Sequence, residues 1–154
     1  MVPTLSLRRV RIKDLPRILE IEKQFYADAF TIDIFEDYEL ESKMGLGFFG
    51  VLEVGGEIAG YAIAIDHLDG TYNIESIAIA PEFQGKQYSV YLVEVLENFI
   101  KRDSRAEAIT LEVAETNTKA RNLYEKFGYH YTDKKIERFY LDGTTALVMK
   151  KDLI

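Results

Sequence analysis

The chain has 154 residues, of which 47% are hydrophobic and 29% are charged, and this balance is typical of one globular domain with its own core. It contains no cysteine, which excludes disulfides, thiolate metal sites and a cysteine acyl-enzyme. The two histidines, His67 and His130, lie far apart in the sequence, so we expect no metal centre built on histidine.

The net charge of the chain indicates which kinds of molecule it can bind. Asp and Glu number 26 against 19 Lys and Arg, a formal charge of −7. Such a surface repels a phosphate backbone, so we expect no nucleic-acid partner, and it mildly favours cationic substrates such as amines. No apolar run approaches the ~20 residues of a membrane span, and the N-terminus lacks a signal-peptide pattern. We therefore expect a cytoplasmic protein without a membrane partner, folded as one domain over residues 1–154.

The N-terminal quarter predicts one strand and two helices. The strand is expected over Leu5–Ile12. Asp14 reads as a helix N-cap and Pro16 as a first-turn residue. A second helix is expected over Asp33–Met44, after an aromatic-rich loop. One face of the first helix carries apolar residues at helical spacing, namely Leu15, Ile18, Ile21 and Phe25.

The middle of the chain predicts a hairpin, a further strand and a helix. Two consecutive glycines, Gly55 and Gly56, separate the apolar runs Phe48–Val54 and Glu57–Asp66, which is a strong hairpin pattern. A third strand is expected over Tyr72–Ala80, and the proline at position 81 ends it because proline lacks a backbone donor. The next helix, ending at Lys101, is predicted by an apolar stripe made of Val90, Val93, Leu96, Phe99 and Ile100.

The C-terminal third completes the pattern with a strand Ile109–Val113, a helix from Asn117 to Gly128, and a strand pair Tyr131–Tyr140 and Thr145–Lys151 joined at Asp142-Gly143. The resulting order is β-α-α-β-β-β-α-β-α-β-β. Alternation of this kind predicts a mixed α/β sandwich around one central sheet.

The segment LEVAETNTKARNLYEKFGY, residues 111–129, carries the most information about function. It resembles the second conserved block of the GNAT N-acyltransferase superfamily, a strand followed by N-x-x-A-x-x-L-Y-x-x-x-G-F/Y. The fixed positions of that block are all present, as Asn117, Ala120, Leu123, Tyr124, Gly128 and Tyr129. The resemblance covers nearly the whole chain. It implies an α/β (α+β mixed) GNAT-like fold, with a central mixed, mostly antiparallel sheet of about seven strands and helices on both faces. It also implies an acetyl-CoA-dependent N-acetyltransferase that needs no metal.

A loop before the third predicted helix resembles the pyrophosphate-binding loop of that family, Q/R-x-x-G-x-G/A. Free backbone amides and the positive dipole end make a helix N-terminus a natural binding site for a diphosphate. Gln84 matches the family pattern, whereas Gln87 and Ser89 replace the glycine and the Gly/Ala. Gln87 either crowds the phosphates or donates to them, and a charged turn is the alternative interpretation of the loop. The residues expected to bind the cofactor here are Gln84, Gly85, Lys86, Gln87, Tyr88 and Ser89.

The strand before this loop is the expected site of the thioester. In GNAT proteins it splays from the next strand and its backbone pairs with the pantetheine arm; the resemblance gives this role to Ile77, Ala78 and Ile79. A backbone amide there would also polarise the thioester carbonyl. Strand alternation predicts two faces, with Glu75, Ile77 and Ile79 on one and Ile74, Ser76 and Ala78 on the other.

Acetyl transfer to an amine requires a base, because an α-amine has a pKa near ~8 and a lysine near ~10.4. Glu75 is the first candidate, since it lies on the strand beside the expected thioester; a structural ion-pairing role is an equal alternative. His67, in a nearby loop, is a second candidate base, with a solvated loop histidine as its alternative.

The leaving thiolate needs a proton donor. Tyr124 matches the family tyrosine that is assigned this general-acid role, and a core aromatic beside Ala120 and Phe127 is the alternative. Asn117 matches the family residue that contacts the cofactor arm, and it is equally suited to cap a helix.

The C-terminal segment 137–149 bears on the acceptor. It is similar to the R-x-Y-Y-x-D-G-x-x-A-L-x-M ending of the ribosomal-protein-alanine (RimI-like) N-terminal acetyltransferases, with Phe139 in place of the first tyrosine. In that subfamily a tyrosine here, Tyr140 in this chain, binds the substrate backbone. The loop after the first helix, here with Phe25, Tyr26 and Phe30, lines the pocket for the N-terminal side chain. The resemblance thus implies a protein N-terminus as acceptor, and an ordinary Asp-Gly hairpin is the alternative.

Two other functions stay open at this point. A small amine such as a polyamine could be the acceptor, and a non-catalytic acyl-CoA-binding homologue is suggested by Gln87. The sequence leaves open the acyl chain length and the oligomeric state, a homodimer included. The acidity that a polyamine site needs could come from Asp28, Asp33, Glu36 and Asp37, which otherwise read as a solvated helix face.

Overall fold

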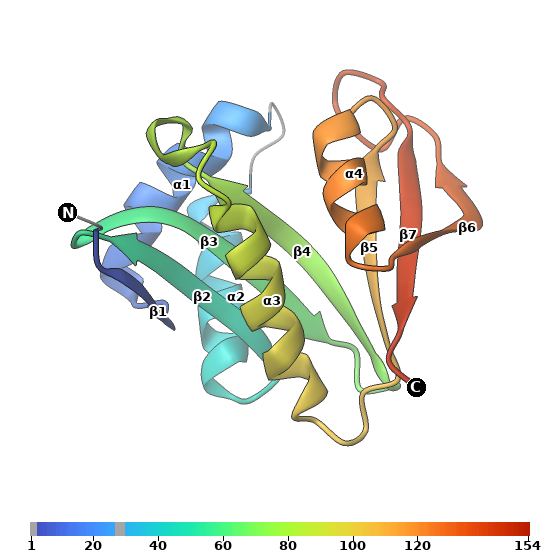
Figure 1. The fold of residues 1–154 in the computed structure, drawn as a ribbon, viewed down its shortest axis with the longest axis horizontal. Helices are drawn as coiled ribbons and strands as arrows, with labels where there is room; N and C mark the ends of the chain where they lie inside the picture. The colour runs from blue at the N-terminus through green and yellow to red at the C-terminus, as the bar shows by residue number, and fades with distance from the viewer. Residues whose placement is uncertain (1–2, 27–29) are drawn as a thin grey trace.

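The computed structural model describes residues 3–26 and 30–154 of the chain, which form one seven-stranded sheet with helices on both faces (Figure 1). The strands are β1 (Leu5–Arg9), β2 (Gly47–Val54), β3 (Glu57–Asp66), β4 (Thr71–Ile79), β5 (Ala108–Ala114), β6 (His130–Ile136) and β7 (Ala146–Asp152). The helices are α1 (Leu15–Phe25), α2 (Ile32–Lys43), α3 (Tyr88–Lys101) and α4 (Thr118–Lys126), with short 3-10 helices at Ile12–Asp14 and Pro81–Phe83.

The strand order in the sheet is β1-β2-β3-β4-β5-β7-β6. Neighbouring strands are antiparallel except for β4 and β5, which run parallel. The β2–β3 hairpin turns at Gly55 and Gly56, and both have positive φ, at +59° and +85°, as a tight two-residue turn requires. The predicted fold class and element order are confirmed.

The helices divide the core into two layers. α1 and α2 pack on one face of the sheet, where Ile18 and Phe35 are fully buried. α3 and α4 cover the other face, in front of the sheet in Figure 1, where Leu96 and Leu111 are buried. The apolar stripes of α1 and α3 therefore pack on the same sheet from opposite sides. Two residues of the predicted stripes, Phe25 and Phe99, are instead 41% and 37% exposed.

The sheet opens between its two parallel strands. β4 pairs with β5 only over Thr71–Ile74, opposite Ala108–Leu111. Beyond these four pairs β4 continues to Ile79 and β5 to Ala114, and Figure 1 shows the two strands moving apart. The backbone groups of β4 that face this opening have no ladder partner on β5, so they remain able to bond a ligand.

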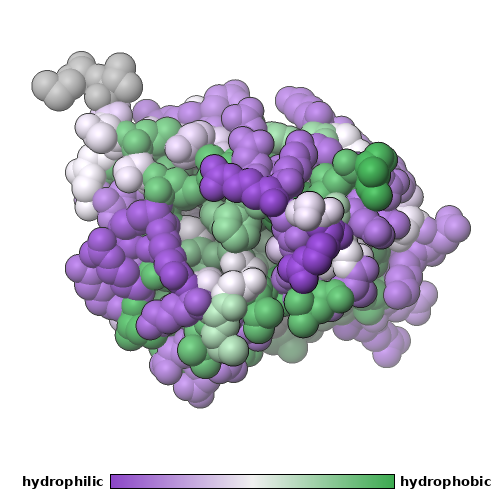
Figure 2. All heavy atoms as spheres, turned by 90° about the horizontal axis from the view of Figure 1, so that it is seen from below, coloured by the Kyte–Doolittle hydropathy of each residue, from purple (hydrophilic) through white to green (hydrophobic). Residues whose placement is uncertain are grey.

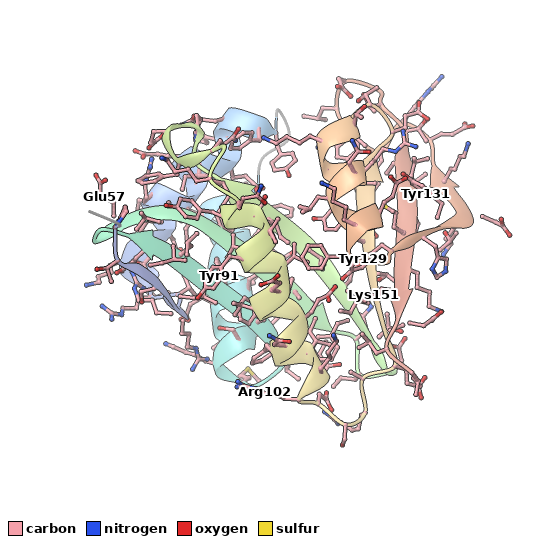
Figure 3. All side chains as sticks on the ribbon, viewed as in Figure 1. Glu57, Tyr91, Arg102, Tyr129, Tyr131 and Lys151 are labelled. Atoms are coloured by element: carbon pink, nitrogen blue, oxygen red, sulfur yellow. The ribbon has the colours of Figure 1, made fainter. Side chains whose placement is uncertain are left out.

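An ion pair with a buried carboxylate joins α3 to β7 beside the paired end of β4 and β5, where Lys151 lies opposite Ile109. Lys151 of β7 donates to Glu97 of α3 at 2.7 Å, and Glu97 is only 4% exposed. The ammonium group also lies 5.8 Å from the centre of the Tyr129 ring. Figure 3 shows Tyr129 and Lys151 between α3 and the β5–β7 side of the molecule. Burial, followed by the Glu97 charge, raises the pKa of Tyr129 and keeps its hydroxyl neutral.

The N-terminal boundary differs from the prediction. β1 ends at Arg9 rather than Ile12, because a 3-10 turn follows at once. Asp14 does occupy the position before α1, but its carboxylate does not cap that helix. It accepts from the backbone N–H of Arg11 at 2.7 Å and pairs with Arg8 at 2.8 Å. The hydrogen bond from Arg8 lowers the pKa of Asp14, so this carboxylate anchors β1 instead.

The last hairpin also differs from the prediction. β6 ends at Ile136, so the predicted strand through Tyr140 is wrong, and Tyr140 lies in the connection to β7. The pairing slips between Tyr131 and Lys135, and Arg138 has a positive φ of +54°, which a regular strand does not permit. Tyr140 therefore lies in a loop, outside the regular pairing of β6 with β7.

The surface is mixed in character. In the view from below, hydrophilic and hydrophobic side chains are interspersed over the described residues (Figure 2). Exposed large apolar residues are spread over separate elements, such as Leu40 on α2, Phe99 on α3 and Leu141 after β6. Within residues 3–26 and 30–154, no helix has the length and hydrophobicity of a membrane span.

The ion pair between Lys151 and Glu97 makes a testable contribution to stability. Lys151→Met leaves a buried carboxylate with only Lys101, 4.0 Å away, as a cationic neighbour, so we expect a loss of about 2 kcal/mol in the free energy of unfolding. Urea denaturation measures it. The matched control is Lys150→Met on the same strand, whose pair with Asp152 is solvent-exposed and should change stability by less than about 0.5 kcal/mol. Equal effects of the two changes would refute the role of the buried pair.

Candidate active site

A β-bulge lies at the point where the sheet opens. In the β3–β4 ladder Ile63 faces Ser76 and Ala64 faces Ile74, so Glu75 is the extra, unpaired residue. Consecutive side chains consequently turn to the same face: Glu75 is hydrogen-bonded to Tyr38 of α2, and Ser76 donates to Glu22 of α1 at 2.9 Å. Bulges of this kind re-aim a side chain beside a functional site.

The bulge overturns the predicted alternation of β4. Ile74 was expected to share a face with Ser76 and Ala78, but it packs in the core under α3. Ala78 packs in the core under α1 and α2, on the side to which Ser76 points. Ile77 packs against the α3-side core, so Glu75 and Ile77 do not share a face as predicted. The one extra residue reverses the phase of the strand from that point onward.

Glu75 is half-buried in a polar cluster. Burial raises the pKa of its carboxyl, and the nearby charge of Glu112 raises it further. A hydrogen bond from Asn73 and the charge of His67 oppose this increase in the pKa. Glu75 is thus a carboxylate with a raised proton affinity, which suits a general base better than a solvated glutamate. His67 lies close enough to influence it, but in an exposed position.

Glu112 is a functional candidate that the sequence interpretation missed. It directly follows Leu111, the last residue of β5 paired with β4. Asn73 links the two carboxylates: its amide donates to Glu112 at 3.3 Å, and its oxygen accepts from Thr110 at 2.8 Å. The available signal was a charged residue inside an otherwise apolar strand, at the start of the GNAT-like block.

Tyr124 lies on α4, the helix that follows β5, the strand that borders the opening opposite β4. It is 8% exposed, and its ring packs edge-on against Tyr129 with 5.5 Å between centroids. Burial raises the pKa of its hydroxyl, and the nearby hydroxyls of Tyr26 and Tyr140 raise it further. Tyr124 is therefore neutral and able to donate a proton at physiological pH.

The structure thus places close together three residues that are far apart in the sequence: Tyr26 at the end of α1, Tyr124 on α4 and Tyr140 before β7. Tyr124 was predicted as the proton donor, and the other two were predicted to bind the substrate. Phe25 is 41% exposed at the last turn of α1. Phe30 contacts Tyr38 edge-on, with 5.6 Å between ring centroids, and so belongs to the Glu75 side of the site. Of the acidic residues considered for a polyamine, Asp28 lies outside the described residues, and Asp33, Glu36 and Asp37 are exposed on α2.

The loop before α3 joins the end of β4 to a helix N-terminus. The side chain of Gln84 donates to the carbonyl of Ile79 at 3.1 Å, which fastens the loop to the strand. Gly85 and Gln87 both have positive φ, +79° and +66°. Gln87 occupies the N-cap position of α3 in the left-handed region, where a non-glycine residue is strained. Position 87 therefore has the conformation that the family glycine would adopt without strain.

Asn117 caps α4. Its side-chain oxygen accepts from the backbone N–H of Ala120 at 3.1 Å. Because β4 and β5 are parallel, their carboxyl ends lie at the same edge of the sheet. The loop at Gln84–Gln87 follows one strand and Asn117 follows the other, so the N-termini of α3 and α4 flank the opening from both sides. Within the described part of the chain, no cluster of three or more His, Asp or Glu side chains could hold a metal ion.

Comparison with known proteins agrees with this geometry. Residues 15–129 match the family model described as the acetyltransferase (GNAT) family. The chain is 29% identical over 144 residues to a putative ribosomal protein bS18-alanine N-acetyltransferase of Bacillus subtilis, covering 94% of this chain and 93% of the relative. It is 28% identical over 159 residues to an N-alpha-acetyltransferase of Saccharolobus solfataricus, covering 96% and 93%.

The fold has a solved counterpart. The crystal structure of the ribosomal-protein-S18-alanine N-acetyltransferase from Escherichia coli superposes with a TM-score of 0.84 at 25% sequence identity, covering 97% of this chain and 94% of that one. The family match spans most of the chain, and it includes the bulged strand, the loop before α3 and the helix that carries Tyr124. The chain therefore belongs to the GNAT family and is an N-acetyltransferase.

Proposed function

We propose that this enzyme transfers the acetyl group of acetyl-CoA to the α-amine at the N-terminus of a protein, and that residues 1–154 act as a single domain. The observation that carries this proposal is the opening between β4 and β5, with half-buried Glu75 on one side and buried Tyr124 on the other. Two relatives are named for activity on ribosomal-protein alanine, which favours a protein N-terminus over a free small amine.

The proposed acetyl-CoA site uses three features. Backbone groups along β4 alternate between β3 and the opening, and Ala80 N–H donates to Ala59 of β3, so Ala78 also directs its groups to β3 while Ile77 and Ile79 face the opening. The Ile79 carbonyl already accepts from Gln84, so the groups of Ile77 and the N–H of Ile79 can pair with the amides of the pantetheine arm. The diphosphate is proposed to lie at the N-terminus of α3, with Gly85, Lys86, Tyr88 and Ser89 beside it. Asn117 uses its oxygen for the helix cap, and its amide nitrogen remains as a donor for the cofactor arm.

The proposed chemistry is direct transfer. The amine nitrogen attacks the thioester carbonyl carbon while Glu75 accepts the proton that the amine loses. The C–S bond then breaks, and the departing thiolate takes the proton of the Tyr124 hydroxyl. Burial of both side chains matters because it keeps a carboxylate of raised basicity and a neutral phenol in one site.

The proposed acceptor site lies on the α1–α2 side of the opening. Tyr26 and Tyr140 lie near Tyr124, which places them beside the reacting amine and the first peptide bond of a bound N-terminus. Phe25 and Phe30 belong to the same end of the molecule and are proposed to line the pocket of the first side chain.

Thiol release from acetyl-CoA tests the function. The assay compares peptides with a free N-terminus, N-terminally blocked peptides that contain lysine, and polyamines. Turnover confined to free N-termini supports the proposal. Turnover of polyamines alone would assign a small-amine acetyltransferase, and acetyl-CoA binding without any turnover would assign a non-catalytic role. Acceptor identity is then refined by varying the first two residues of the peptide.

Tyr124→Phe should lower kcat by about 10- to 100-fold, because the leaving thiolate loses its proton donor. The affinity for acetyl-CoA should change little, since the ring remains in place. Steady-state kinetics and calorimetry measure the two quantities. The matched control is Tyr131→Phe on the same half of the molecule, whose hydroxyl bonds Arg121 and Glu125 at the surface. If Tyr124→Phe and Tyr131→Phe behave alike, Tyr124 has no part in the proton transfer.

The pH dependence tests the base. Glu75 must be ionised to accept a proton, so kcat/KM should fall as the pH drops through its raised pKa, above the ~4.3 of a free glutamate. Glu75→Gln should remove this acid limb and lower kcat about 100-fold. Glu112→Gln should keep activity and move the limb to lower pH, because the Glu112 charge raises the pKa of Glu75. The opposite pattern, with activity lost only in Glu112→Gln, would make Glu112 the base.

Glu75→Gln should also change the stability of the protein. The sign of this change follows from the linkage between proton binding and folding. The folded state binds the Glu75 proton more tightly than the unfolded state, so the charged carboxylate costs stability once the pH rises above its pKa. Glu75→Gln should therefore unfold at higher temperature than wild type at pH 7. The difference should vanish below about pH 4, where both states of wild type are protonated.

Gln87→Gly should relieve the left-handed strain and raise the free energy of unfolding by about 0.5–1 kcal/mol, the penalty at φ +66° less the added freedom of glycine when unfolded. Gln87→Ala keeps the backbone strain and removes only the side chain beyond Cβ. It therefore distinguishes the effect of the backbone conformation from the effect of the side-chain contacts. Calorimetry with acetyl-CoA then decides the role of the side chain. Weaker binding by both variants would show that Gln87 contacts the phosphates; tighter binding would show that it crowds them.

A further inference from the structure

A buried carboxylate on α1 lies directly behind the proposed acceptor site. Glu22 is 2% exposed. One oxygen accepts hydrogen bonds from the hydroxyls of Ser76, at 2.9 Å, and Tyr61; the other accepts from the backbone N–H of Phe30 at 3.1 Å. Within the described residues, no lysine or arginine forms an ion pair with it. Three hydrogen-bond donors therefore replace the water that this carboxylate lost.

The three donors belong to different parts of the site. Ser76 is the residue that follows bulged Glu75 on β4, so its bond fixes the direction of the bulge. Phe30 precedes α2, and its ring packs on Tyr38, which is itself hydrogen-bonded to Glu75. Glu22 is thus connected to Glu75 in two ways. One connection runs through Ser76 on β4, and the other runs through Phe30 and Tyr38.

We propose that Glu22 is a positioning residue for the acceptor: it holds the segment at Phe30 and the bulge at Ser76 in the relative placement that the incoming amine requires. The inference rests on the proposed function of the same site. It predicts a change in the acceptor KM and in kcat but not in the acetyl-CoA KM, because the proposed cofactor site lies at the N-termini of α3 and α4, which pack on the opposite face of the sheet from α1 and α2.

The nature of the substitution matters. Methionine has a similar length but accepts no strong hydrogen bond, so Glu22→Met leaves the Phe30 N–H and both hydroxyls without their acceptor. Glutamine can accept from the Phe30 N–H with its oxygen and donate to a hydroxyl oxygen with its nitrogen. Glu22→Gln should therefore restore most of the function, whereas a role that required the negative charge would be lost in both variants.

The matched control is Glu39, a buried glutamate on α2 that is 3% exposed and pairs with Lys43 rather than with any residue of the site. Glu39→Met also removes a buried carboxylate from the α1–α2 layer and tests the effect of stability alone.

The experiment measures kcat, the KM for the acceptor and the KM for acetyl-CoA in these variants, at a temperature where all are folded. We expect Glu22→Met to raise the acceptor KM about tenfold, equivalent to ~1.4 kcal/mol, with lower kcat and an unchanged acetyl-CoA KM. Glu22→Gln should be near wild type, and Glu39→Met should keep all three constants. If Glu22→Met does not fold, Ser76→Ala tests the connection through β4 alone and should lower kcat severalfold.

The outcomes separate the two proposals. A wild-type enzyme that acetylates no peptide overturns the proposed function. An active wild type with an unchanged acceptor KM and kcat in Glu22→Met, or in Ser76→Ala if that variant replaces it, overturns the positioning role alone. A rise in the acetyl-CoA KM equal to that for the acceptor would also overturn it, because it would show a general loosening of the fold.

Discussion

The structure depends on one constraint: two parallel strands that share only four residue pairs before they separate. A parallel pair cannot be closed by a short hairpin, so β4 and β5 are joined by the long crossover through α3. α3 packs on β2, β3 and β4, and its N-terminus follows the end of β4 at the edge where the two strands have separated. The ion pair between Glu97 and Lys151 fastens this helix to β7 at the end where β4 and β5 are still paired.

Burial of polar groups organises both sides of the opening. Glu75 and Asn73 of β4 form a polar cluster with Glu112 of β5, and Tyr26 and Tyr140 lie near Tyr124 of α4. Low solvent exposure acts on these groups in opposite ways: it makes a carboxylate more basic and keeps a phenol protonated. One physical effect thus supports both proposed roles, Glu75 as the base and Tyr124 as the acid.

The sequence predicted the fold class, the order of the elements and the block around Tyr124, because apolar periodicity and turn residues are local properties. It missed what depends on pairing between strands. The extra residue at Glu75 is invisible in a strand read alone, since only its register with Ile63 and Ala64 reveals the bulge. Asp14 looked like a helix cap because Arg8, its actual partner, lies on the preceding strand. The roles of Glu112 and Glu22 likewise arise from contacts with residues 39 and 54 positions away.

The unpaired edge of β4 has a thermodynamic consequence. Beyond Ile74 the backbone groups on this edge have no strand partner on β5, so the boundary between β4 and β5 is a place where the protein can open locally. A small molecule that hydrogen-bonds along this edge would serve as the missing strand and tie the two lobes together. Such a ligand raises the free energy of unfolding of the whole domain, and it does so more the tighter it binds. The cosubstrate would therefore contribute to the folded structure as well as donate the acyl group.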